Sequence, residues 1–158
     1  MAYVNYEYYS GLYGSNAIPT EDFNRLLWDA EIEVDRATTG VDGVRKLEIA
    51  FPTNERDAEA VKRCICALIE FLHNIETAEK GIAYSETANG VRGNIIQSVS
   101  AGNESVSYAN AETMISTALK SVNHKYKMIN EFIVHRLGGI LDSNGVHLLY
   151  MGVYPKKI

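Results

Sequence analysis

The chain has 158 residues, which is about the size of one domain. Hydrophobic residues make up 46% of it and charged residues 22%, a globular composition that excludes disorder over the whole length. Lys and Arg number 15 against 20 Asp and Glu, which gives a formal net charge of -5. The chain therefore lacks the basic excess with which nucleic-acid binders neutralise phosphates, and avid binding of DNA or RNA is not expected.

The N-terminal segment is unusually rich in tyrosine. The chain has 10 Tyr against 4 Phe and 1 Trp, and five tyrosines fall within the first thirteen positions: Tyr3, Tyr6, Tyr8, Tyr9 and Tyr13. This segment lacks the basic and apolar regions of a signal peptide, and no apolar run is long enough for a membrane span, so neither secretion nor membrane insertion is expected. The crowded tyrosines predict a partner surface outside the core.

Three segments, about residues 20–38, 54–81 and 112–137, show the periodicity of amphipathic helices. The first begins with acidic residues, which suit a helix N-terminus, and ends before Gly40. Its apolar stripe consists of Phe23, Leu26, Leu27, Ala30, Val34 and Ala37. The third helix is expected to end at Gly138. Together the three helices predict a mainly α fold, a three-helix or four-helix bundle forming a single domain over residues 1–158.

Three shorter segments favour extended structure, because they either alternate apolar and polar side chains or are apolar throughout. Residues 47–51 alternate apolar and polar side chains, which predicts a short extended piece. Residues 85–110 are rich in Ser, Asn and Gly and are too long for a plain linker. Their alternation predicts a β-hairpin or loop that protrudes from the bundle. Residues 146–151, after an Asp-Ser-Asn-Gly turn, predict a short C-terminal strand.

Candidate sites for chemistry are few. Glu70 and His73 have the Glu-x-x-His spacing of carboxylate-bridged metal bundles, but the chain has no second copy of the motif. Cys64 and Cys66 lie within a predicted helix, where a small buried apolar role is expected, and their spacing fits neither a disulfide nor a metal hook. No nucleophile elbow or phosphate-binding loop is present. The sequence therefore predicts no catalytic residue, cofactor or metal, and a reducing compartment.

One set of motifs resembles a known family. The motifs are Tyr-Tyr and Tyr-Gly near residues 8–14, Phe-Pro before the second helix, Leu-Leu-Tyr-Met-Gly at residues 148–152, and above all S-V-S-x-G-x-x-S-V-S-Y at residues 98–108. This pattern resembles the small head–tail connector proteins, or head-completion adaptors, of tailed bacteriophages. The resemblance spans nearly the whole chain, but an insert around residues 83–95 departs from the family's simplest pattern.

The resemblance implies a mainly helical virion-assembly protein with no catalytic activity. Members of this family form rings of about a dozen subunits. They dock on the portal protein, extend the DNA channel and present a platform to the next connector or tail protein. The expected location is the virion neck, and the host cytoplasm during assembly. In such a ring the acidic balance lets DNA pass without specific binding.

Contacts with other subunits or partners are predicted in the protruding loop and the C-terminal segment. The predicted residues are Ile95, Val99, Gly102, Val106, Tyr108, Tyr150, Met151 and Tyr154. Two other functions remain open at this point: a small helical metal-binding protein using Glu70 and His73, and a regulatory interaction protein unrelated to phage.

Overall fold

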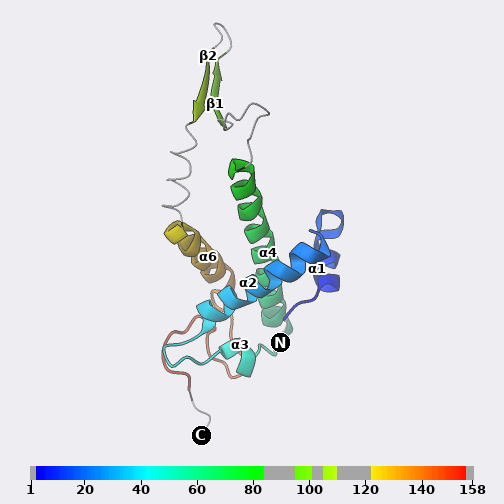
Figure 1. Cartoon of the computed structure of the whole chain (residues 1–158). Helices are drawn as coiled ribbons and strands as arrows, with labels where there is room; N and C mark the ends of the chain where they lie inside the picture. Colours follow the sequence, from blue (N-terminus) through cyan, green and yellow to red (C-terminus); the bar gives the residue numbers. More distant parts are fainter. Residues whose placement is uncertain (1–2, 84–94, 101–104, 110–121, 156–158) are drawn as a thin grey trace. The chain divides into compact units, whose positions relative to one another are not determined.

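The computed structural model describes residues 3–83, 95–100, 105–109 and 122–155 (Figure 1). These residues form a mainly helical chain. The chain divides into two compact units, Met1–His73 with Met128–Ile158, and Asn74–Lys127. None of the helices in the described part of the chain is long and apolar enough to cross a membrane.

The predicted helices are present. Helix α2 spans Thr20–Thr38 and helix α4 spans Glu55–Ala83. Helix α6 spans Val122–Leu137, so the predicted end of the third helix is confirmed, while its expected start near residue 112 lies outside the described residues. The core in the first unit combines side chains from all three helices, among them Phe23, Ile65 and Ile133. The mainly α fold class is therefore confirmed.

The N-terminal tyrosine segment forms a helix that the sequence analysis did not predict. Helix α1 spans Tyr6–Tyr13 and is followed by the short 3-10 helix η1, Gly14–Asn16. Asn5 caps α1, because its side chain accepts a hydrogen bond from the Tyr8 N–H at 2.8 Å. Gly14 ends it with a φ of 57°, a conformation that suits glycine.

Tyrosines of α1 pack into the core rather than outside it. Tyr9 is fully buried, and its ring lies 4.9 Å from the rings of Tyr13 and Phe23. Tyr6 also contacts Phe23, edge to face at 5.3 Å. We call these four residues the tyrosine cluster. The prediction that the N-terminal tyrosines lie outside the core is wrong, because their three- and four-residue spacing places rings on the buried side of a helix.

The prediction of an extended piece at residues 47–51 is also wrong. Its first part is a one-turn helix, α3, over Lys46–Ile49. Leu47 is buried in the core, while Ile49 is exposed. Lys46 is fully buried, and its Nζ donates hydrogen bonds to the backbone carbonyls of Leu148, at 2.8 Å, and Tyr150. The pKa of this ammonium group is lowered by its burial.

Residues 138–155, here called the C-terminal arm, pack against the rest of the first unit. Over residues 146–151, where a strand was predicted, the structure has an isolated bridge between Leu141 and His147 followed by a turn. Asp142 holds a tight turn by accepting the N–H groups of Asn144 and Val146. The arm comes very close to the loop after α2. A Cβ added at Gly40 would lie 2.6 Å from the Gly152 carbonyl oxygen.

The second unit contains two short strands. β1 spans Ile95–Ser100 and β2 spans Ser105–Ala109. They pair antiparallel, with Val99 opposite Val106 and an irregularity between Ile96 and Ser98. Residues 85–94, 101–104 and 110 of the predicted protruding loop lie outside the described residues.

Candidate functional site

The residues predicted to contact partners fall in two places. Ile95 and Val99 lie in β1, and Val106 and Tyr108 lie in β2. The register pairs Val99 with Val106 and places serine pairs before and after them. The strand pair therefore brings four of the predicted contact residues together. Gly102 lies outside the described residues.

The other three predicted contact residues lie in the C-terminal arm, and they differ from one another. Tyr150 and Met151 are about half exposed, at 48% and 50%. Tyr154 is buried: its hydroxyl donates to Asp142, and its backbone N–H donates to Asp42 Oδ2 at 2.6 Å. Within the described structure Tyr154 therefore holds the arm against its own chain and is not presented to a partner.

Glu70 and the two cysteines, which were considered for metal binding and nucleophilic chemistry, take part in the packing of the first unit. Glu70 accepts a hydrogen bond from the Tyr9 hydroxyl, which ties it to the tyrosine cluster. The described residues contain no group of three side chains able to hold a metal ion. Cys64 and Cys66 are free and buried, and burial raises the pKa of each thiol to about 12. The predicted apolar role of the two cysteines is confirmed.

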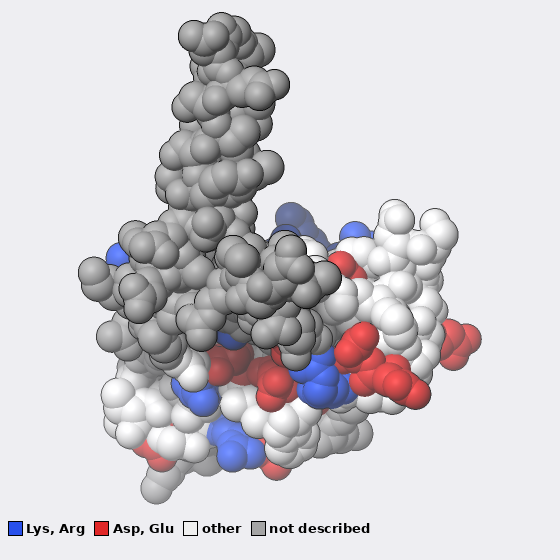
Figure 2. All heavy atoms as spheres, turned by 45° about the horizontal axis from the view of Figure 1, so that its top comes forward, with Lys and Arg blue, Asp and Glu red and all other residues white. Residues whose placement is uncertain are grey.

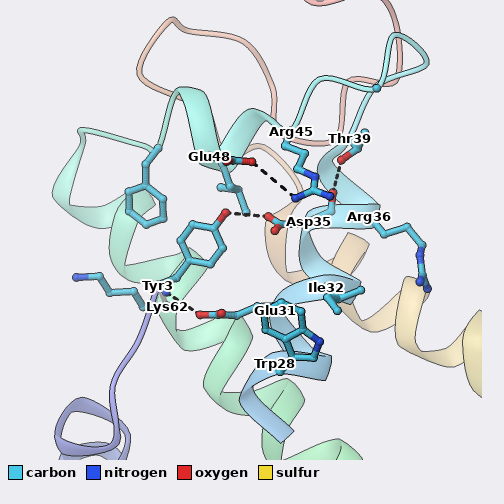
Figure 3. Close-up of a pocket in the computed structure, with 13 residues that line it drawn as sticks. Tyr3, Trp28, Glu31, Ile32, Asp35, Arg36, Thr39, Arg45, Glu48 and Lys62 are labelled. Carbon is cyan, nitrogen blue, oxygen red and sulfur yellow. Dashed lines mark hydrogen bonds and ion pairs between the residues drawn. The ribbon is translucent and has the colours of Figure 1, made fainter. Parts of the chain in front are cut away.

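The sequence analysis missed a cleft of about 980 Å³ in the first unit (Figure 3). Four separate parts of the chain form it: the residues before α1, the outer side of α2, the segment from Gly43 to Phe51, and Lys62 of α4. We call it the acidic–aromatic cleft. Its lining residues are Tyr3, Trp28, Glu31, Ile32, Asp35, Arg36, Thr39, Gly43, Arg45, Leu47, Glu48, Phe51 and Lys62.

Helix α2 supplies one wall of this cleft. Trp28, Glu31, Ile32 and Asp35 stand at positions i, i+3, i+4 and i+7, so they share one side of the helix. Figure 3 shows them along the same stretch of α2. Trp28 is 68% exposed, which is unusual for the largest side chain of a small protein. The buried stripe of α2, which includes Leu26 and Ala30, lies on another side of the helix.

Tyr3 bridges the two carboxylates of that wall. Its backbone N–H donates to Glu31 Oε1 at 2.6 Å, and its hydroxyl donates to Asp35 Oδ1 at 2.9 Å. The Tyr3 ring stacks on Phe51, with centroids 5.7 Å apart and planes inclined by 14°. Burial raises the pKa of the Glu31 and Asp35 carboxyl groups, and burial together with Asp35 raises the pKa of Tyr3.

Three basic residues also line the cleft, and each has a contact of its own. Arg36 pairs with Glu33 at 2.7 Å, and Arg45 approaches Glu48 at 3.8 Å. Lys62 Nζ lies 5.7 Å from the centre of the Tyr8 ring. The cleft thus presents half-buried carboxylates beside an exposed indole, an arrangement suited to a positively charged ligand.

The described surface shows no continuous basic patch in the view of Figure 2, where acidic and basic side chains are intermixed. This distribution agrees with the acidic balance of the whole sequence. Comparison with protein-family models, with curated proteins and with solved structures finds no match to this chain.

Proposed function

We propose that the chain is a head–tail connector of a tailed bacteriophage, an assembly protein without catalytic activity. In this proposal it oligomerises into a ring of about a dozen subunits, docks on the portal protein and receives the next connector or tail protein. It would act at the virion neck, after assembly in the host cytoplasm. The sequence resemblance described above motivates the proposal, most specifically through the serine–valine motif of residues 98–108.

The observation that carries the proposal is an antiparallel strand pair between two helices. The motif with the most specific resemblance coincides with β1 and β2, which follow α4 and precede α6 in the chain. A two-stranded unit is only marginally stable by itself in water. In the proposed ring, the strand pair gains its stability from neighbouring subunits by edge pairing and apolar contact.

The net charge supports the proposed passage of DNA. A ring lumen with a negative potential repels phosphates, so DNA slides through it without being held. The proposed DNA channel therefore needs no specific DNA-binding residue. The charge of -5 and the intermixed charges in Figure 2 are compatible with such a lumen.

Ring formation is tested with the purified chain, alone and mixed with its cognate portal protein. Light scattering after size-exclusion chromatography gives the subunit number, and negative-stain images give the shape. We expect a ring in the mixture even if the isolated chain is monomeric, because the portal serves as a template. Failure to form or join a ring in both samples would overturn the proposal.

The strand pair is tested by adding one charge. Val99→Asp and Val106→Asp, made separately, are expected to reduce ring assembly at least about tenfold while leaving the monomer's melting temperature unchanged. Ser100→Asp is the matched control, since it places the same charge on the same strand beside Val99. A large drop in monomer stability would instead show that the valines belong to the chain's own core.

A further inference from the structure

The acidic–aromatic cleft contains two carboxylates, Glu31 and Asp35, that accept hydrogen bonds from the N–H and hydroxyl of Tyr3, which are neutral donors. In the described part of the chain, the ion pairs formed by Arg36 and Arg45 go to other acids. The charge of the N-terminal ammonium acts on both carboxylates and that of Arg45 acts on Asp35, but burial has the larger effect on the pKa of each. Both carboxylates therefore gain from a cation that reaches them directly.

An aromatic surface stands beside these carboxylates. Trp28 lies one helical turn before Glu31 and Ile32, and 68% of it is exposed. Tryptophan is the best of the aromatic side chains for attracting a cation to its ring face. Exposed tryptophans are also over-represented among the residues that contribute most to binding between proteins.

The remaining lining residues suit the stem of a long basic side chain. The stacked rings of Tyr3 and Phe51, together with Ile32 and Leu47, provide apolar surface next to the carboxylates. Arginine and lysine bury their methylene stems on such surfaces while the charged group meets a polar partner. Arginine fits this combination best, because its flat guanidinium both stacks on indole and pairs with carboxylate oxygens.

We propose that the acidic–aromatic cleft binds an arginine or lysine side chain on an exposed segment of a partner protein. Glu31 and Asp35 receive the charged group, and Trp28 stacks against it. Charge complementarity at Glu31 and Asp35 selects this occupant over an acidic peptide or a phosphate. The other charged lining residues have contacts of their own: Arg45 pairs with Glu48, Arg36 pairs with Glu33, and Lys62 lies over the Tyr8 ring. The proposal goes beyond the connector function and does not depend on ring formation.

The experiment uses Trp28 as its probe, because it is the single tryptophan of the chain. End-capped tetra-arginine, tetra-lysine and tetra-glutamate peptides are titrated into the purified full-length chain at fixed salt, and the emission of Trp28 is followed. Anisotropy of a labelled tetra-arginine peptide provides a second measurement of affinity. We expect a saturable change with tetra-arginine, a weaker one with tetra-lysine and none with tetra-glutamate.

The double variant Glu31→Gln with Asp35→Asn keeps the hydrogen-bond acceptors for Tyr3 but removes both charges. It is expected to weaken tetra-arginine binding at least about tenfold, since hydrogen bonds from a cation to a carboxylate are about twice as strong as those to a neutral amide oxygen. Glu21→Gln with Glu55→Gln is the matched control, because it changes the net charge equally at exposed positions outside the cleft lining. The control variant is expected to bind like the unaltered chain.

Several results would overturn the proposal. These are the absence of a saturable signal with either basic peptide, equal binding of tetra-glutamate, or equal losses in the cleft and control variants. A shift of the Trp28 spectrum on replacing Lys156 and Lys157 by Ala would assign the cleft to the chain's own tail. A spectrum that depends on protein concentration without peptide would assign it to a second copy. Each of these outcomes leaves the ring-assembly test unaffected.

Discussion

Helix α1 and the C-terminal arm come from opposite ends of the sequence and both belong to the first unit, but different contacts hold them. α1 is held mainly by aromatic rings, with Tyr9 inside the tyrosine cluster. The arm buries Leu148 in the core and adds buried polar contacts, in which Lys46 and Asp42 bind its backbone. Ring burial tolerates small displacements, whereas buried polar contacts fail together when one partner is lost. The two regions should therefore respond differently to substitution and to pH.

The largest expected effect is at the tyrosine cluster. Tyr9→Ala removes a fully buried ring and the hydroxyl that bonds Glu70, and it should lower the free energy of unfolding by about 3–5 kcal/mol. Urea denaturation followed by circular dichroism measures this change. Tyr126→Ala, at a tyrosine that is 54% exposed, is the control and should change stability by less than about 0.5 kcal/mol. Equal effects at both positions would contradict the core role of α1.

An intermediate effect is expected at the arm. Lys46→Met fills similar space but leaves the carbonyls of Leu148 and Tyr150 without their donor, which should cost about 2 kcal/mol. The loss should be local. Amide hydrogen exchange should speed up at Leu148, whose N–H donates to the Ile140 carbonyl, and at Val41, whose N–H donates to the Met151 carbonyl.

The exposed Arg56 offers a control for this experiment. Arg56→Met removes a positive charge from the first turn of α4, and it should leave both amides as protected as before. If the Lys46 variant exchanged faster throughout the tyrosine cluster as well, then the arm and α1 would not be separate regions.

The smallest expected effect is a dependence on alkaline pH. Burial, aided by Glu70, raises the pKa of Tyr9 in the folded chain above its ordinary value of 10. Above pH 10 the unfolded chain therefore loses this proton before the folded chain does. The stabilisation that comes from this raised pKa is therefore complete below pH 10. Between pH 10 and the pKa of folded Tyr9, the free energy of unfolding falls by about 1.4 kcal/mol for each pH unit. Tyr9→Phe should make the fall of stability above pH 10 shallower, as measured by thermal melts, and parallel slopes would contradict this.

Much of the fold could be predicted from local pattern. α2 and α4 have long apolar stripes with acidic first turns, and these signals depend only on neighbouring residues. α1 was missed although its signals are local as well: Asn5 before it, Gly14 after it, and tyrosines spaced by three and four. The tyrosines were interpreted by residue type as a partner surface, when their spacing already indicated a buried helix face.

The acidic–aromatic cleft could not be predicted in the same way. Its walls come from residues before α1, from α2, from the segment around α3 and from α4, and only tertiary packing brings them together. One signal was available: Trp28 lies off the apolar stripe of α2, so a large ring was expected on the polar side of that helix. The pairing of Tyr3 with Glu31 and Asp35 spans about thirty residues of sequence and left no local trace.

The close approach of Gly40 to Gly152 leaves no room for a side chain at position 40. Any side chain there would press on the Gly152 carbonyl oxygen and push this part of the C-terminal arm outward. A single methyl group would thus change how the arm is presented to its surroundings. Tyr150 and Met151 are half exposed next to Gly152, so the size of residue 40 controls the position of two side chains that a partner would contact.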